Sequence, residues 1–87
     1  MLFSIQLGPQ AEKFVKKLDS QPKERIKNKL LKLQDDPFPQ EVERVEGYKG
    51  EKVFRVRVGD YRILYIVRYD INLILVSNID KRGKVYD

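Results

Sequence analysis

Apolar and polar residues alternate at the start of the chain. In residues 2–7, apolar side chains recur at every second position, at Phe3, Ile5 and Leu7, which is the spacing of a strand with one buried face. A glycine–proline pair follows and interrupts the pattern. The sequence therefore predicts that a short strand opens the fold.

Two amphipathic helices are predicted next. Residues 9–18 carry apolar side chains at helical spacing, and the proline that begins this run suits a first helical turn, where its missing N–H costs nothing. Helical spacing resumes at Ile26, Leu30 and Leu33, and we expect Ser20 to cap this second helix. Two prolines then end it. We expect the two helices to form a hairpin.

A loop and three strands are predicted to follow. Residues 37–52 contain two prolines and two glycines, and we expect them to form a long loop. Strands are predicted at 53–58 and 61–69, because β-branched and aromatic residues recur there on either side of a glycine–aspartate turn. A third strand begins with four consecutive apolar residues at 73–76, which is typical of a central strand buried on both faces.

The order of these elements indicates an α+β fold. An N-terminal strand, a two-helix hairpin and a three-stranded antiparallel meander are expected to form one antiparallel sheet with the helices packed on one face. The 87 residues suffice for one core, so we expect a single domain over residues 1–87.

Composition narrows the possible functions. The chain has 18 Lys and Arg against 13 Asp and Glu, a formal net charge of +5, which favours an anionic partner such as nucleic acid. It has neither cysteine nor histidine, so a thiolate nucleophile, an imidazole base, a serine triad and most zinc sites are excluded. No apolar run of about 18 residues and no secretory signal are seen. We expect a cytoplasmic protein with no membrane partner.

Metal chemistry is not favoured either. Asp60, Asp70 and Asp80 lie at predicted turns or strand ends, where aspartate is common because of its local hydrogen bonds. We therefore expect neither a metal site nor a cofactor.

Arginines concentrate in the predicted meander, where five of the seven lie between residues 55 and 82. A tight turn at Gly59 and Asp60 would place Arg57 opposite Arg62, and the same register would turn Arg55 to the same face. Opposed like charges destabilise a sheet, so a purely structural sheet gains nothing from this arrangement. We interpret the lysines of the helices, by contrast, as solvated faces.

The last strand is expected to return beside Arg62 and to bring Lys81 and Arg82 to the same end of the sheet. Guanidinium groups bind phosphate through two parallel hydrogen bonds, so we interpret the cluster as a phosphate-binding site. The alternative is a salt-bridged structural face, in which the paired acids are Glu43, Glu46 or Glu51.

Cleavage of RNA without a metal needs proton transfer in addition to cations. Arginine cannot act as the base, because its pKa is above about 12. Nearby cations lower the pKa of a phenol or of an ammonium group. Tyr86, four residues beyond Arg82, is the first candidate for proton transfer, and Lys81 and Lys84 are the next.

The meander also resembles a known family. Residues 54–65, FRVRVGDYRILY, followed by IDKR at 79–82 and by Val85 and Tyr86, resemble the RelE/ParE toxin superfamily and in particular the RelE-type mRNA interferases. The order of strand, helical hairpin and meander matches as well, over nearly the whole chain. The resemblance implies a type II toxin of the prokaryotic cytoplasm that cuts mRNA in the ribosomal A site without a metal and is inhibited by a cognate antitoxin.

By the same resemblance, the functional positions of the family fall on Arg55, Arg57, Arg62, Arg82 and Tyr86. We expect the catalytic residues to be Arg57, Arg62, Arg82 and Tyr86, and the residues that bind the substrate phosphate to be Arg55, Arg57, Lys81 and Lys84. Some active members have lysines at the positions of Arg55 and Arg57. Arginine cannot act as a base, so this difference assigns a larger part of the proton transfer to Tyr86 in this chain. Two alternatives stay open: a non-enzymatic ParE-type inhibitor of DNA gyrase, and a degenerate toxin that only binds its antitoxin.

Overall fold

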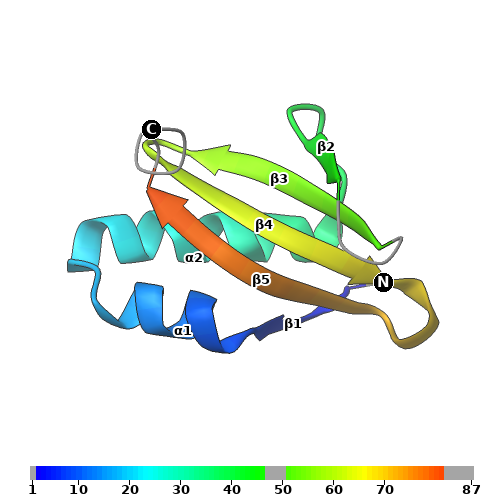
Figure 1. Ribbon diagram of the computed structural model, residues 1–87, viewed down its shortest axis with the longest axis horizontal. Helices are drawn as coiled ribbons and strands as arrows, with labels where there is room; N and C mark the ends of the chain where they lie inside the picture. The colour runs from blue at the N-terminus through cyan, green and yellow to red at the C-terminus, as the bar shows by residue number, and fades with distance from the viewer. Residues whose placement is uncertain (1, 47–50, 82–87) are drawn as a thin grey trace.

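Two helices lie against one face of a five-stranded sheet in the part of the chain that the structure describes (Figure 1). The computed structural model describes residues 2–46 and 51–81. It confirms the predicted α+β class, with an N-terminal strand and a helical hairpin. Neither described helix has the length and apolar character needed to cross a membrane. In chain order the elements are β1 (Ser4–Leu7), α1 (Pro9–Lys16), α2 (Ser20–Asp35), β2 (Glu43–Glu46), β3 (Lys52–Val58), β4 (Tyr61–Arg68), the 3₁₀ turn η2 (Tyr69–Ile71) and β5 (Leu73–Lys81).

The meander has one strand more than predicted. Strand order in the sheet is β1-β5-β4-β3-β2, and β2 pairs antiparallel with β3. The prediction assigned residues 37–52 to a loop and counted three meander strands, which was wrong. Strand β2 has a single apolar residue, Val45, so it shows no alternation of apolar and polar positions. It joins the sheet through its backbone at the edge of β3.

The sheet is mixed rather than antiparallel. Strand β1 lies at the other edge and runs parallel to β5, with Ser4 opposite Leu73, so the predicted antiparallel sheet was wrong in this respect. A parallel pair needs a long connection between its strands. The two helices and strands β2 to β4 supply that connection, and no single stretch of sequence reveals it.

The second helix begins at the residue that was expected to cap it. Ser20 is the first residue of α2, and Asp19 occupies the N-cap position without a side-chain capping hydrogen bond. The prediction that Ser20 caps this helix was therefore wrong. Helix α1 begins at Pro9 as predicted and ends at Lys16.

The core lies between the helices and one face of the sheet. In β5, Ile74 and Val76 are buried, but Leu73 and Leu75 are only partly buried, because the helices cover one face alone. The prediction that this strand is buried on both faces was wrong. The fully buried apolar side chains are Ala11, Ile26, Leu33, Val56, Ile63, Tyr65, Ile74, Val76 and Ile79.

Strand β5 contains one extra residue, Ser77, relative to β4. Because of this bulge, Val76 and Ile79 both face the core although they do not stand at alternate positions. Beyond the bulge, Asp80 lies opposite Arg62. The bulge therefore determines which residues of β5 reach the cationic end of the sheet.

Tyr65 fixes the segment between α2 and β2. Its hydroxyl donates a buried hydrogen bond of 2.6 Å to the backbone carbonyl of Pro37, and burial raises the pKa of the phenol. Further along the same segment, Glu41 forms an ion pair with Lys29 of α2. These contacts hold the chain that leads into β2.

Replacing Tyr65 by phenylalanine removes this hydrogen bond and leaves the Pro37 carbonyl buried without it. We expect Tyr65→Phe to lower the free energy of unfolding by about 1–3 kcal/mol, measured by urea denaturation followed by circular dichroism. Tyr69→Phe is the matched control, because Tyr69 is 62% exposed, and it should change the value by less than about 0.5 kcal/mol. Equal stability of the two variants would contradict the role given to Tyr65.

Candidate functional site

The β3–β4 hairpin has the register expected from the sequence. Arg57 lies opposite Arg62, and Arg55 lies opposite Leu64, as predicted. Val56, between the two arginines of β3, is fully buried in the core, so its neighbours point to the opposite face. We call this the cationic face and define it by Arg55, Arg57 and Arg62.

Gly59 closes the hairpin with a φ of 58°, a left-handed conformation that favours glycine. A Cβ atom at this position would lie 2.8 Å from Nη2 of Arg25, so the guanidinium of this α2 residue packs against the turn. Arg25 therefore lies at the same end of the sheet as Arg57 and Arg62. No pattern in the sequence marks Arg25 as part of this end of the sheet, because helical spacing does not reveal how α2 packs against the hairpin.

Arg62 is the buried cation of the cationic face, with 8% of its surface exposed. The expectation that the last strand returns beside Arg62 is confirmed, but the residue directly opposite is the acid Asp80, and Lys81 lies opposite Tyr61. Since Tyr61 packs against Phe14 of α1, this register places Lys81 on the helix side of the sheet and not on the cationic face. Burial restricts a long side chain to few rotamers. The Arg62 guanidinium is therefore oriented before any ligand binds.

Three of the expected site residues, Arg82, Lys84 and Tyr86, lie outside the described residues. Their roles stay predictions.

Glu43 of β2 brings a carboxylate to the cationic face. It lies opposite Arg55, and its Oε1 accepts hydrogen bonds from Nε and Nη2 of Arg55 at 3.0 and 2.6 Å. Together with Glu41 and Arg57, the pair lines a cavity of about 310 Å³. The alternative interpretation, in which the chain's own acids pair with the cluster, is thus correct for Arg55. Glu43 was among the acids expected to pair with the cluster, but it lies in strand β2 and not in a loop.

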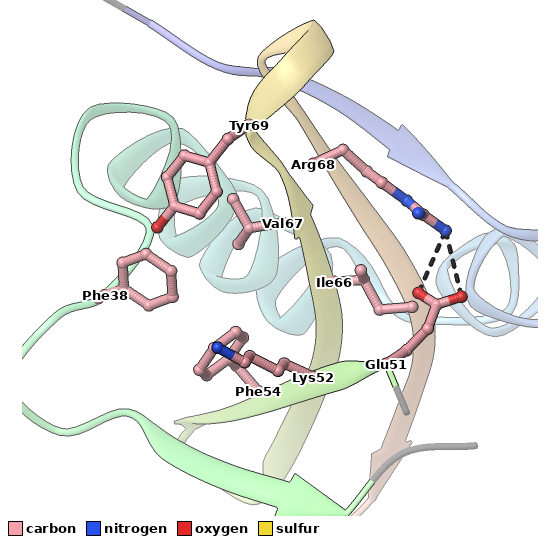
Figure 2. A pocket seen from close by; sticks show the side chains of 8 residues that line it. All are labelled: Phe38, Glu51, Lys52, Phe54, Ile66, Val67, Arg68 and Tyr69. Atoms are coloured by element: carbon pink, nitrogen blue, oxygen red, sulfur yellow. Dashed lines mark hydrogen bonds and ion pairs between the residues drawn. The ribbon is translucent and has the colours of Figure 1, made fainter. Parts of the chain in front are cut away.

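A second pocket lies at the other end of the β3–β4 pair (Figure 2). There Nη2 of Arg68 donates to both carboxylate oxygens of Glu51, at 3.1 and 3.2 Å. Arg68 is therefore held apart from the cationic face. The pocket has a volume of about 350 Å³ and is lined by Phe38, Glu51, Lys52, Phe54, Ile66, Val67, Arg68 and Tyr69.

The chemistry that the cationic face can perform follows from its donors. Among residues 2–46 and 51–81, no group of three or more His, Cys, Asp or Glu could hold a metal ion. Guanidinium groups can bind a phosphodiester in bidentate fashion and stabilise developing negative charge. They cannot accept a proton, because they stay charged at any physiological pH.

Comparisons with known proteins agree with this architecture. Residues 5–86 match the model of a family described as the ParE toxin of the type II toxin–antitoxin system parDE. A protein of Methanocaldococcus jannaschii with the provisional name toxin RelE1 is 29% identical over an alignment of 87 positions, which covers 99% of this chain and 97% of that protein.

Solved structures show the same fold. The archaeal RelE–RelB complex from Pyrococcus horikoshii OT3 contains a chain with a TM-score of 0.82 and 26% identity, over 98% of this chain and 100% of that one. The RelBE2 toxin–antitoxin complex from Mycobacterium tuberculosis contains a chain with a TM-score of 0.80 and 17% identity, over 94% of this chain and 100% of that one. At the lower identity the likeness is one of fold alone.

The positive charges around Glu43 predict a shift in its pKa that a titration can measure. Hydrogen bonding and charge from Arg55 hold the pKa of Glu43 below its ordinary value, and the charges of Arg57 and Arg62 add to the effect. Glu43 therefore stays ionised until the pH falls through this lowered pKa, where its ion pair with Arg55 is lost. In a carboxyl NMR titration, Arg55→Ala should move the pKa of Glu43 back up. The matched variant Arg68→Ala should leave it unchanged, and equal effects of both variants would contradict the assignment.

Proposed function

This chain belongs to the RelE/ParE toxin superfamily of type II toxin–antitoxin systems, and we propose that it is a ribosome-dependent endoribonuclease that cleaves mRNA without a metal ion. The observation that carries the proposal is the opposed pair Arg57–Arg62 on a sheet face that neither α1 nor α2 covers. Opposed like charges weaken a sheet. A phosphodiester bound between them relieves the repulsion and accepts hydrogen bonds from both.

The proposed reaction is an attack of the RNA 2′-hydroxyl on the adjacent phosphorus. A bond forms between the 2′ oxygen and phosphorus, and the bond from phosphorus to the 5′ oxygen breaks. A base takes the 2′ proton, and an acid gives a proton to the leaving 5′ oxygen. Each proton transfer typically contributes a factor of about 10² to 10⁴ to the rate. The substrate implies that the protein acts in the cytoplasm, with the ribosomes.

The cationic residues of the site stabilise the negative charge that develops on the phosphoryl oxygens. Arg57 and Arg62 lie on both sides of the reacting phosphate, and the buried position of Arg62 supports this role, because a preorganised donor needs no reorientation during the reaction. Arg82 adds a further catalytic guanidinium. The flanking phosphates are bound by Arg55 and Lys84.

Tyr86 is the proposed proton-transfer residue. Arginine cannot take this part, and the reaction needs a group whose pKa can approach neutrality. A phenol among cations meets that requirement, because positive charge stabilises the phenolate.

A second candidate function follows from the matching family model, which is that of the ParE toxin. The protein would then be a non-enzymatic toxin that inhibits DNA gyrase. Inhibition of supercoiling by purified gyrase, with mRNA left intact on ribosomes, would select this function. A degenerate toxin that only binds an antitoxin would do neither.

The proposed partner is a cognate antitoxin that covers the cationic face. The relative from P. horikoshii was solved as a RelE–RelB complex, and a net charge of +5 favours an acidic binding segment. We expect co-expression of an adjacent short reading frame to restore growth and to yield a complex on size-exclusion chromatography. Failure of its product to bind the toxin would count against this partner.

The nuclease proposal predicts unequal effects of two arginine substitutions. Arg57 is exposed, so Arg57→Ala should leave the protein folded, while mRNA cleavage on purified ribosomes should fall by about 10² to 10³-fold. Arg68→Ala removes the same side chain at the far end of the hairpin and should leave the rate within about twofold. Cut sites are mapped by primer extension, and folding is checked by circular dichroism. A wild-type rate for folded Arg57→Ala would refute the proposal.

A further inference from the structure

The guanidinium of Arg55, which the proposed function assigns to phosphate binding, is already bound by the carboxylate of Glu43. Oε1 of Glu43 accepts hydrogen bonds from Nε and Nη2 of Arg55, at 3.0 and 2.6 Å, and the two residues are directly opposite in the β2–β3 ladder. A guanidinium binds carboxylate and phosphate with the same planar set of N–H donors. Glu43 therefore occupies donors that a phosphate on Arg55 would use.

The Glu43–Arg55 contact can open without disturbing the core. Glu43 lies on β2, a strand of 4 residues at the edge of the sheet. Its side chain is 54% exposed, against 27% for Arg55, and exposed ion pairs are weak because water solvates both partners. None of the fully buried core residues in the described chain belongs to β2.

The residues around Glu43 keep its carboxylate charged and available to bind Arg55. Arg55, Arg57 and Arg62 all favour its ionised form. Glu41, the other acid of the same cavity, forms its ion pair with Lys29 of α2. Of the two acids that line this cavity, Glu43 is therefore the one that binds Arg55.

We propose that Glu43 is a specificity-determining residue that competes with the RNA phosphate for Arg55. This inference rests on the proposed function, which assigns Arg55 to phosphate binding. A single anion that reaches Arg55 alone must displace a carboxylate and gains no additional charge pair. A polyanion that reaches Arg57 at the same time gains an additional charge pair with Arg57, and this gain offsets the loss of the Glu43–Arg55 contact. The competition lowers the affinity of the cationic face for isolated anions.

The test measures binding of an RNA that cannot be cut. A short single-stranded oligonucleotide with 2′-O-methyl groups throughout lacks the attacking hydroxyl, and its dissociation constant is measured by fluorescence anisotropy at several salt concentrations. Glu43→Gln preserves the side-chain shape and removes the charge. We expect it to bind the oligonucleotide about two- to fivefold more tightly at low salt, which is the strength of one exposed ion pair. The slope of log affinity against log salt should steepen by about 0.7, as for one additional phosphate contact.

Two further variants control for charge and shape. Glu51→Gln changes the net charge by the same amount and opens an ion pair of the same kind, the Glu51–Arg68 pair at the far end of the hairpin (Figure 2). It should leave the salt slope unchanged and the affinity within about 1.5-fold of wild type. Glu43→Asp retains the negative charge and should bind more weakly than Glu43→Gln.

Two outcomes would overturn the inference. The first is an equal gain in affinity for Glu43→Gln and Glu51→Gln, which would make the effect one of net charge. The second is slower cleavage of mRNA by Glu43→Gln with unchanged binding of the oligonucleotide, which would place Glu43 in proton transfer. Wild-type protein that cuts no mRNA on ribosomes would remove the nuclease proposal, whereas tighter binding by Glu43→Gln alone would still support the competition.

Discussion

The pairing register of strands β3 and β4 determines both the core and the position of the arginines. Along β3 and β4, side chains alternate between the core and the opposite face, so the pairing that buries Val56 against Ile63 also sets Arg57 against Arg62. A slip of one residue would separate the arginines but would turn charged side chains into the core. Desolvating an unpaired charge costs several kcal/mol, far more than the roughly 0.2 to 1 kcal/mol of opposed like charges. The core therefore maintains a charge arrangement that the sheet alone disfavours.

The strands on either side of this hairpin bring negative charge to it. Asp80 of β5 lies opposite Arg62, and Glu43 of β2 lies opposite Arg55. Both positions depend on packing elsewhere: the bulge in β5 determines which of its residues reaches Arg62, and the buried hydrogen bond of Tyr65 fixes the segment that leads into β2. The electrostatics of the cationic face are thus a consequence of the core. A change in packing far from the arginines would alter which acids oppose them.

The features that could be predicted from the sequence are those that local patterns determine. The turn at Gly59 and the alternation on both sides of it gave the hairpin register, and with it the opposed arginines. Strand β2 was missed because Glu43–Glu46 pairs through its backbone and carries almost no apolar signal. The parallel direction of β1 and the position of Arg25 beside the turn depend on how distant segments pack. The roles of Arg82 and Tyr86 rest on the family resemblance and stay predictions.

The same charges bear on which group can move a proton in the proposed reaction. A general base works best when its pKa lies near the operating pH. The arginines lower the pKa of Glu43, which moves a carboxylate further from neutrality and makes it a weaker base. Positive charge also lowers the pKa of a phenol, but this pKa starts above neutrality and so moves toward it. These pKa directions support the two proposed roles, in which the phenol of Tyr86 transfers a proton and the carboxylate of Glu43 competes for Arg55.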